Sequence, residues 1–420
     1  MTSKAKSKSK KIEKAKAGKK VKSTVSTKAI RNFCITLVAV IVLIVLVSII
    51  LFIRKKEADR TVKVAFCGIP QEVTTFIEGQ IPKSDDYNVV CSYLNKDDVD
   101  LKTVSEKFDL FFTWNGEISD TLSKFSEDLP SKIIQTIPTS LRSKKTYPLA
   151  LDHFELTYFQ PVFDKNGLEE PGSWKEFEEY LKESSKHVFT PFFCQGSDDR
   201  TLLAFIACIV ESRGGLSAYE KLIELLKKSG SLEEKMDVEL GQCEDGALTI
   251  RLVLDMLKNW AQEGYVHPLW YLGTRNDVLY FMEDKQVAVL FESLTDHRSV
   301  PYSIIRDYTS MRFPLDSYAK EHCLISPAIV AMSLSNNMNN DDLLLPFAND
   351  EVQSRFSMLT KLGPTHSRAE SYDRQADDVR FWAASCKGGP VPDPALAVYQ
   401  RKPEQMKELA AEIRTYLKTK

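Results

Sequence analysis

The stretch YPLALDHFELTYFQPVFDKNGLEEPGSWKEFEEYLK, residues 147–182, decides how the rest of the chain is organised. Its first part, 147–163, is mostly apolar and suits a buried, extended segment. A turn is expected over 164–167. Ser173 and Glu176 then stand three residues apart, the spacing of a capping box at the start of an amphipathic helix. The stretch therefore predicts a buried strand that leads, after a turn, into a capped helix.

Charge is distributed very unevenly along the 420 residues. Residues 1–31 hold eleven lysines, one arginine and one glutamate, a net charge of +11. The whole chain carries −2 and residues 32–53 carry no charge, so residues 54–420 carry −13. The basic segment has almost no large apolar side chains, cannot bury a core, and is expected to be disordered. A nucleic-acid-binding arm is one interpretation; we favour a positive cytoplasmic tail because of the segment that follows.

That segment, NFCITLVAVIVLIVLVSIILFI at 32–53, is uncharged and ends at three cations, 54–56. As a helix it would span about 33 Å, enough for the hydrocarbon core of a bilayer. The alternative, a cleaved signal peptide, usually has a shorter apolar region followed by small residues. Cys34 lies at the start of the apolar run, which argues against cleavage and lipid attachment there. We therefore expect a single-pass anchor in the cell membrane, with a cytoplasmic N-terminus and 54–420 outside, in the periplasm.

Beyond the apolar segment the composition is that of a globular protein with room for two or three core units. Seven cysteines occur there without a CxxC pair or regular spacing, so neither a zinc site nor a disulfide framework is predicted. Several lie in apolar runs and are expected to be buried. One or two disulfides remain possible in an oxidising compartment, and the sequence does not pair them.

The chain after residue 60 alternates between short β-rich runs and helical patterns. Strands are predicted over 61–67, 87–93 and 108–113, and helices over 72–81 and 96–107. This alternation predicts a parallel sheet with covering helices. Ligands of such sheets bind beyond the carboxyl ends of the strands, where the loops GIPQE and WNGE are expected.

Glycines divide the predicted helices further along the chain. A helix over 201–212 is followed by a glycine pair ending at Gly215, and an amphipathic helix is predicted over 216–228. A further helix over 248–262 is closed by Gly264.

Catalytic motifs are absent from the sequence, since no nucleophile elbow, P-loop, GxGxxG or HExxH occurs. We predict no enzyme activity, no metal and no cofactor. Trp114, with Asn115 and Glu117 beside it, has the chemistry of a carbohydrate site. An aromatic face covers the apolar side of a sugar, and carboxylates or amides pair with its hydroxyls. Trp114 could equally be a core residue, so both interpretations stay open at this point.

Several motifs resemble the extracellular solute-binding proteins of carbohydrate ABC importers, nearest to the maltose/maltodextrin-binding type. They are YPLALD at 147–152, FDLFFTW at 108–114, GYVHP at 264–268, NDVLYFMEDKQVAVLFES at 276–293 and KGGPVPDP at 387–394. Their order and spacing together carry the resemblance, which covers about residues 61–417. It implies an α/β, two-lobed periplasmic-binding-protein fold with a ligand cleft between the lobes. It also implies permease subunits of an ABC importer as partners, and no nucleic acid.

On this resemblance, the first lobe comprises about 61–151 and 326–360, and the second about 152–325 and 361–420. Trp114 would stack on a sugar ring, while Glu117 and Asp152 would bond its hydroxyls. The second lobe would contribute Gln195, Asp198, Arg200, Glu292 and Ser293.

The chain also departs from the family pattern. The family usually has Tyr-Asn where this chain has Tyr158 and Phe159, and an aromatic residue is missing after Ser293. Trp382 or Trp270 would have to supply the second stacking plate.

Three functions follow from these features. The first is a membrane-anchored protein that captures a sugar or oligosaccharide for ABC-type import. The second is a sensory or interaction module on the same fold that has lost the transport ligand. The third is a carbohydrate-active enzyme, for which Glu117 and Asp152 would be the pair of carboxylates to test.

Overall fold

The computed structural model describes residues 27–58, 61–82, 87–97, 99–167, 169–334 and 340–418. Most of the basic tail, for which disorder was expected, lies outside the described residues. The chain divides into two units, Met1–Arg60 and Thr61–Lys420, which are described separately.

The described part of the first unit is one helix, α1 (Thr27–Ala58). Its apolar window, Ile35–Phe52, is long and apolar enough to cross a membrane, and none of it is buried within the protein. A second helix, α8 (Asp199–Lys227), passes the same test of length and composition. Because 83% of α8 is buried, it is a core helix of the second unit instead.

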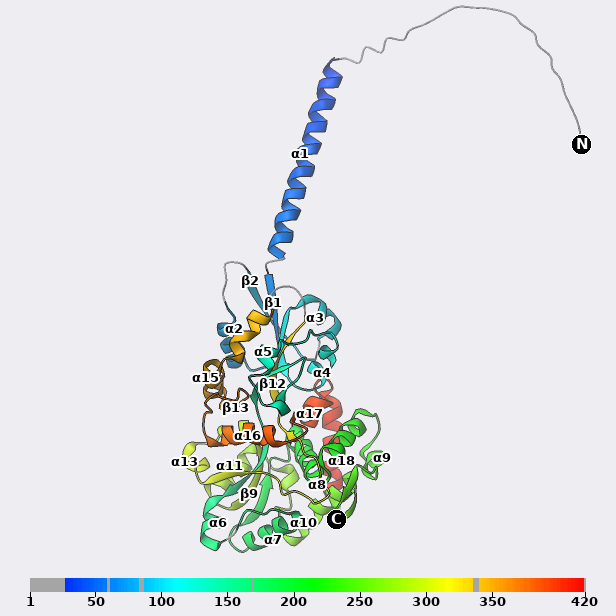
Figure 1. Cartoon of the computed structure of the whole chain (residues 1–420). Coiled ribbons are helices and arrows are strands. Elements are labelled where there is room, and N and C mark those ends of the chain that lie inside the picture. The colour runs from blue at the N-terminus through cyan, green and yellow to red at the C-terminus, as the bar shows by residue number, and fades with distance from the viewer. Residues whose placement is uncertain are drawn as a thin grey trace, which may run out of the picture. The chain divides into compact units, whose positions relative to one another are not determined.

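The second unit is built on two sheets (Figure 1). The six-stranded sheet defines what we call the first lobe. Its strands are β1 (Thr61–Cys67), β2 (Asn88–Leu94), β3 (Leu110–Trp114), β4 (Tyr147–Leu151), β12 (Ala328–Ser333) and β13 (Gly363–Pro364), in the order β13-β4-β12-β3-β1-β2. The pairing of β1 with β2 and with β3 is parallel, which confirms the parallel arrangement predicted from the first three strands of this unit.

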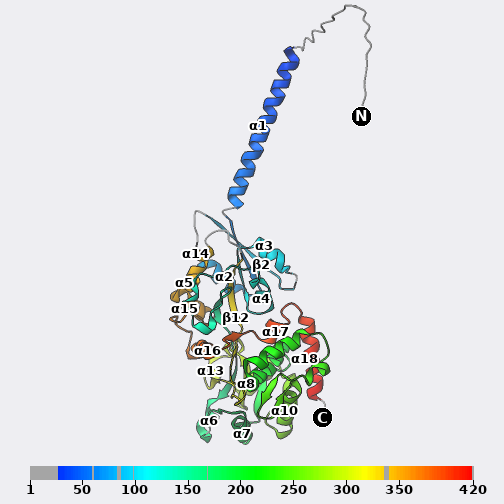
Figure 2. The ribbon, with the colours of Figure 1, turned by 45° about the vertical axis from the view of Figure 1, so that its right-hand side comes forward.

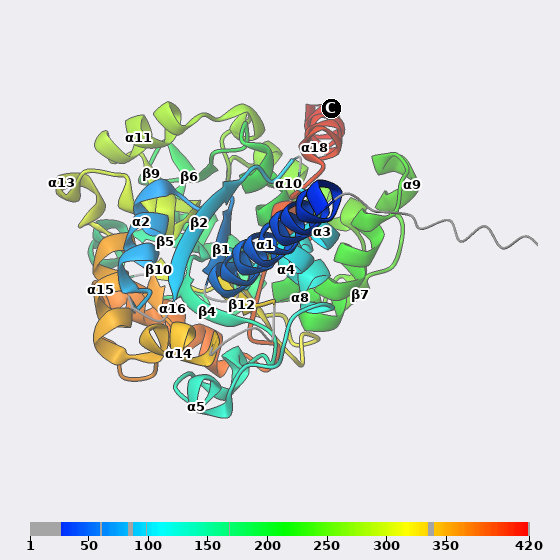
Figure 3. The ribbon, with the colours of Figure 1, turned by 90° about the horizontal axis from the view of Figure 1, so that it is seen from above.

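Helices cover both faces of the first sheet. In the view from above, α2 (Gln71–Gln80) and α15 (Asp350–Thr360) lie on one side of it, and α3 (Leu101–Lys107) and α4 (Glu117–Ser123) on the other (Figure 3). Two separate apolar clusters fill these layers because strand residues alternate between the two faces. The other helical segments of this lobe are α5 (Ser131–Ile134), η1 (Thr139–Leu141), α14 (Asn340–Leu344), η3 (Leu345–Ala348) and α16 (Arg374–Ser385).

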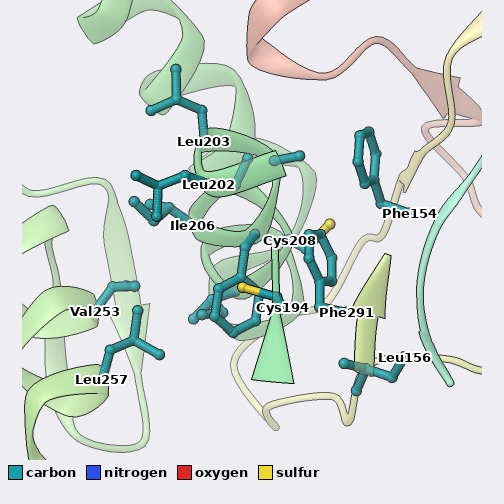
Figure 4. Close-up of a cluster of buried hydrophobic side chains, with 14 of the residues drawn as sticks. Phe154, Leu156, Cys194, Leu202, Leu203, Ile206, Cys208, Val253, Leu257 and Phe291 are labelled. Carbon is teal, nitrogen blue, oxygen red and sulfur yellow. The ribbon is translucent and has the colours of Figure 1, made fainter. Parts of the chain in front are cut away.

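The four-stranded sheet defines the second lobe. Its strands are β5 (Phe154–Phe159), β6 (Thr190–Cys194), β9 (Val287–Ser293) and β10 (Tyr308–Met311), in the order β10-β5-β9-β6. The core lies between this sheet and α8, where Phe154, Phe291 and Cys208 approach one another (Figure 4). Its helical segments are α6 (Gln160–Asn166), α7 (Trp174–Ser184), α8, α9 (Leu232–Met236), α10 (Ile250–Glu263), η2 (Trp270–Leu272), α11 (Arg275–Glu283), α12 (Leu294–Arg298), α13 (Tyr302–Ile305), α17 (Pro394–Ala397) and α18 (Pro403–Lys418).

Two short ribbons complete the unit, β7 (Gly241–Cys243) with β8 (Gly246–Leu248) and β11 (Leu324–Ile325) with β14 (Pro390–Val391). In two views, α16 and α17 lie where the lobes meet (Figures 1 and 2).

The stretch 147–182 passes from one lobe to the other. It forms two strands in different sheets, β4 and β5, separated only by Asp152 and His153. A second crossing runs beside it, because the Asp152 N–H donates to the carbonyl of Pro327 at 2.7 Å. The predicted capping box is confirmed, with Ser173 accepting from the N–H of Glu176 at 3.3 Å.

The predicted turn at 164–167 is wrong in its extent, since α6 continues to Asn166 and only Gly167 has a turn conformation, with φ of 63°. The predicted pair of helices is confirmed, because the backbone leaves the helical conformation at Gly215, with φ of 72° and ψ of −170°, between the two halves of α8. Gly264 ends α10 in the left-handed conformation, as predicted. The seven cysteines outside α1 are all free thiols, which answers the question of disulfides that the sequence left open.

Candidate functional site

Asp152 lies at the first crossing and is nearly inaccessible to solvent, with 2% of its surface exposed. Its carboxylate accepts from its neighbour, the N–H of His153, at 2.9 Å. It also accepts from the N–H and the hydroxyl of Thr295, at 3.2 and 2.8 Å. Burial raises the pKa of Asp152, and the positive charge of Arg200 acts against this shift. The carboxylate therefore joins the end of β4 to the start of α12.

Trp114 is the last residue of β3, and it is half-buried at the edge of the first sheet that faces the second lobe. Its indole N–H donates to the carbonyl of Gly68 at 3.0 Å, which fixes the ring against the loop after β1. The next residue, Asn115, is bonded through its N–H to Ala328, the residue paired with Leu151. The ends of β3 and β4 therefore reach the same edge, which places Trp114 and Asp152 on one side of the lobe junction.

Glu117 begins α4 directly after this edge. Its side chain accepts from the N–H of Arg401 at 3.3 Å, and the N–H of Ile118 donates to the side chain of Gln400 at 3.0 Å. Segment 394–402 therefore packs on the start of α4. Gly116 makes this approach possible, because a side chain there would meet the carbonyl of Leu396.

The loop 195–200 leads from β6 into α8. Gln195 is half-buried, and Asp198 caps the helix by accepting from the N–H and hydroxyl of Thr201, both at 2.8 Å. Arg200 donates from two nitrogens to Asp393, at 3.1 and 2.8 Å. The guanidinium also lies 5.5 Å from the centre of the Phe154 ring. Arg200 therefore contacts the beginning of β5 and the loop before α17 together.

Glu292 and Ser293 end β9 and are both buried. Glu292 accepts from Thr157 at 3.0 Å and from Arg275 at 3.2 Å, and lies 2.8 Å from His297. Burial alone would raise the pKa of Glu292, but His297 and Arg275 hold it below its usual value. Ser293 caps α12 by accepting from the N–H of Asp296 at 3.0 Å.

The two tryptophans considered for a second stacking plate lie in different surroundings. Trp382, on α16, is half-buried, and its ring meets the edge of His153 at 5.2 Å between centres. Trp270 is 1% exposed and packs on Phe205 in the core of the second lobe. Only Trp382 therefore lies beside the crossing.

The structure brings Asp152, Arg200, Ser293 and Trp382 to the junction, where each is held by protein groups. Two participants were not predicted as site residues, namely Thr295 and Asp393. Asp393 lies in the quoted KGGPVPDP loop, so its position was noted although its partner was not. Nothing in the sequence indicated a role for Thr295, apart from the aromatic residue that is missing after Ser293.

The described part of the chain also contains cavities. Four cavities have volumes of about 380, 600, 30 and 10 Å³, and none of these four is lined by Trp114, Glu117 or Asp152. Among the described residues, no three His, Cys, Asp or Glu side chains gather in a way that could hold a metal ion.

Two α/β lobes joined by adjacent crossings are the architecture of sugar and oligosaccharide solute-binding proteins, and the chain has this fold. It is similar in structure to the bacterial solute receptor AcbH, described as exclusive for β-D-galactopyranose. The TM-score is 0.66 at 14% identity, covering 85% of this chain and 98% of the receptor. The fold class expected from the sequence is thus confirmed.

Two further structures extend the likeness. A binding protein of Bacillus subtilis in an open conformation gives a TM-score of 0.61 at 15% identity, covering 85% of this chain and 95% of the other. A sugar transporter of Bacillus licheniformis in complex with stachyose gives 0.53 at 12% identity, covering 84% and 98%. At these identities the likeness concerns the fold. No protein-family model and no curated protein matches the sequence.

Proposed function

We propose that the chain is a membrane-anchored solute-binding protein that captures a sugar or oligosaccharide between its lobes for ABC-type import. It delivers the ligand to the permease subunits of the importer. It is not an enzyme and uses no cofactor. Structural neighbours that bind galactopyranose and stachyose support the ligand class.

The observation that carries this proposal is the shared position of Trp114 and Asp152 at one edge of the first sheet. An aromatic ring and a carboxyl group on one edge suit a sugar, since its ring is apolar on its faces and polar around its rim. The edge is made by the ends of β3 and β4 and faces the second lobe. A ligand here is within reach of residues from both lobes.

We also propose that the remaining predicted site residues line this cleft. Glu117 borders it from α4, and Trp382 provides the second aromatic group. The opposite wall consists of Gln195, Asp198, Arg200, Glu292 and Ser293. The lobes divide at about 151/152 and 325/326, and a third time after α16 instead of at 360/361, since β13 is a strand of the first sheet. The ligand shifts the population toward a closed state because it contacts both lobes.

The membrane assignment follows from the apolar window of α1, Ile35–Phe52. Residues 32–53 anchor the chain in a single pass, residues 1–31 remain cytoplasmic, and the binding domain lies in the periplasm. The cluster of lysines before the span sets this orientation.

A thermal-shift screen of the full chain in detergent tests the proposal. Galactose, stachyose and maltotetraose are the first probes, because neighbours of the same fold bind them. A cleft ligand at about 100 times its Kd stabilises the folded state by about 2.7 kcal/mol, a measurable rise in Tm. A flat response across a broad panel of sugars and oligosaccharides contradicts the proposal.

One observation favours the second candidate, a sensory or interaction module that has lost its transport ligand. Asp152 already accepts three hydrogen bonds from His153 and Thr295, and Arg200 is paired with Asp393. A transport cleft keeps its polar groups free for hydroxyls. The same screen separates the two candidates, since the module predicts no shift with any sugar.

A further inference from the structure

A cavity of about 600 Å³ lies in the second unit, and neither Trp114 nor Asp152 lines it. One wall belongs to α12, α13 and the first residue of β10. The other wall is formed by Lys361, Tyr372 and Asp373, which lie between α15 and α16, and by Gln375 in the first turn of α16. The two walls are joined because the Gln375 amide donates to Glu155 at 2.9 Å and to Ser310 at 2.6 Å. This volume is that of a site for a small ligand.

Two buried polar groups in the cavity wall have no hydrogen-bond partner among the residues that the structure describes. The Nε of Arg298 is one, although another nitrogen of the same guanidinium donates to Asp373 at 2.6 Å. The hydroxyl of Tyr308 is the other, on a side chain that is 6% exposed. Burial raises the pKa of Tyr308, so its phenol keeps its proton at neutral pH. Unpaired buried donors are costly, and an acceptor-rich ligand would satisfy both.

The charge of the lining also favours an acceptor-rich ligand. Arg298, Arg306 and Lys361 line the cavity, whereas Asp373 is the only acid among the lining residues that the structure describes. Asp373 is neutralised by Arg298. The remaining cations are exposed, and Arg306 makes a long contact of 3.7 Å with Asp307. The cavity therefore carries an excess of positive charge next to two free donors.

Aromatic rings complete the lining. Tyr302 is 79% exposed, so its ring is accessible to a ligand in the cavity. Tyr372 is 41% exposed, and Lys361 and Arg298 lie 5.9 and 5.5 Å from its ring centre. Flat faces of this kind stack on the apolar side of a sugar ring.

We propose that this cavity binds a sugar-sized ring that carries an anionic group, either a carboxylate or a phosphate. Arg298, Lys361 and the Tyr308 hydroxyl hold the anion, while Tyr302 and Tyr372 contact the ring. This site does not depend on the function proposed for the cleft, because Trp114, Asp152 and Arg200 are not among the residues that line the cavity.

Calorimetric titration of the full chain in detergent tests the proposal. The probes are D-glucuronate, D-glucose 6-phosphate, D-glucose and inorganic phosphate. At least one of the two anionic sugars should bind, and which one binds distinguishes carboxylate from phosphate. Glucose and inorganic phosphate should each bind at least about tenfold more weakly, because glucose lacks the anionic group and inorganic phosphate lacks the sugar ring. Equal binding of inorganic phosphate, or no binding of either anionic sugar, overturns the proposal.

Substitutions inside and outside the cavity test whether the sugar binds there. Tyr302→Ala and Lys361→Asn should each lower the affinity for the anionic sugar at least about tenfold. Both positions are accessible, and Asn tolerates the left-handed backbone of Lys361, whose φ is 59°. Tyr280→Ala, a similarly exposed tyrosine on α11 outside the cavity, should change nothing, and neither should Trp114→Ala. Unchanged affinity in both cavity variants, or its loss in Trp114→Ala, overturns the proposal even if the cleft binds a sugar.

Discussion

Thr295 donates two hydrogen bonds to Asp152, from its backbone N–H and from its hydroxyl. Asp152 directly follows the last strand residue of the first lobe before the crossing, and Thr295 lies in the first turn of α12 in the second lobe. The pair therefore fixes the point at which the lobes are joined. A change at Thr295 reports on this joint without altering either sheet.

Thr295→Val should lower the free energy of unfolding by about 1–2 kcal/mol, because the buried carboxylate loses one donor while the side-chain volume is kept. Thr295→Ser retains the hydroxyl and should remain within about 0.5 kcal/mol of the original protein. Urea unfolding of both variants measures the difference. Equal stability of the Val and Ser variants would show that the hydroxyl does not contribute.

The pair formed by Arg200 and Asp393 should show strong energetic coupling. Asp393 is completely buried, so Arg200→Met leaves an unpaired carboxylate in the interior. We expect a loss of about 2–3 kcal/mol, less than for a fully buried pair because the arginine is 36% exposed. A double-mutant cycle with Asp393→Asn isolates the coupling, and single losses that simply add would contradict it.

Gly116→Ala should destabilise the chain by about 2 kcal/mol or more. The backbone φ at Gly116 is 138°, and an added side-chain carbon would meet the Leu396 carbonyl of the segment packed on α4. Gly79→Ala is the matched control, since Gly79 lies within α2 with no atom near the added carbon. The control should gain about 0.5–1 kcal/mol. Similar effects of the two substitutions would contradict the close approach of α17 and α4.

Glu155 should make stability depend on pH. Burial raises its pKa from 4.5 to about 7, while His297 and Ser310 act in the opposite direction and Glu292 acts with it. The folded protein thus holds this proton more tightly than the unfolded chain. The stabilisation is present below pH 4.5 and is lost as pH rises toward about 7.

Glu155→Gln removes this dependence because the amide does not titrate. Relative to the original chain, the variant should gain stability between pH 4.5 and about 7, by a few kcal/mol at most. Nearby His153 remains neutral over this range, because burial and then Arg312 lower its pKa to about 3. Unfolding free energies at pH 5 and 7.5 measure the effect, and parallel profiles of the two proteins would contradict it.

The sequence was most informative where a local signal sets a structure. Thr61–Cys67 is β1 within the predicted limits, because its β-rich run ends at a glycine and a proline. The capping box at Ser173 and the glycine at 264 mark helix ends in the same way. Asp152 stood out as an acid in an apolar run, and it lies at the crossing as the resemblance implied.

Contacts between distant parts of the chain could not be predicted from the sequence. Arg200 and Asp393 are 193 residues apart, and nothing local distinguishes them from solvated charges. The predicted helix over 96–107 shortens to Leu101–Lys107, which begins where Asp100 caps it. The 600 Å³ cavity is lined by residues from four elements, and no sequence motif predicted it.

The most direct test of the sugar cleft is calorimetric titration of the full chain and of two Trp114 variants with the best sugar from the thermal-shift screen. We predict a Kd near 1 μM, or about −8 kcal/mol, for the original chain. Trp114→Phe should keep most of this affinity because its ring still stacks, whereas Trp114→Ala should lose at least about tenfold. Unchanged affinity in Trp114→Ala would contradict the placement of the ligand against this ring.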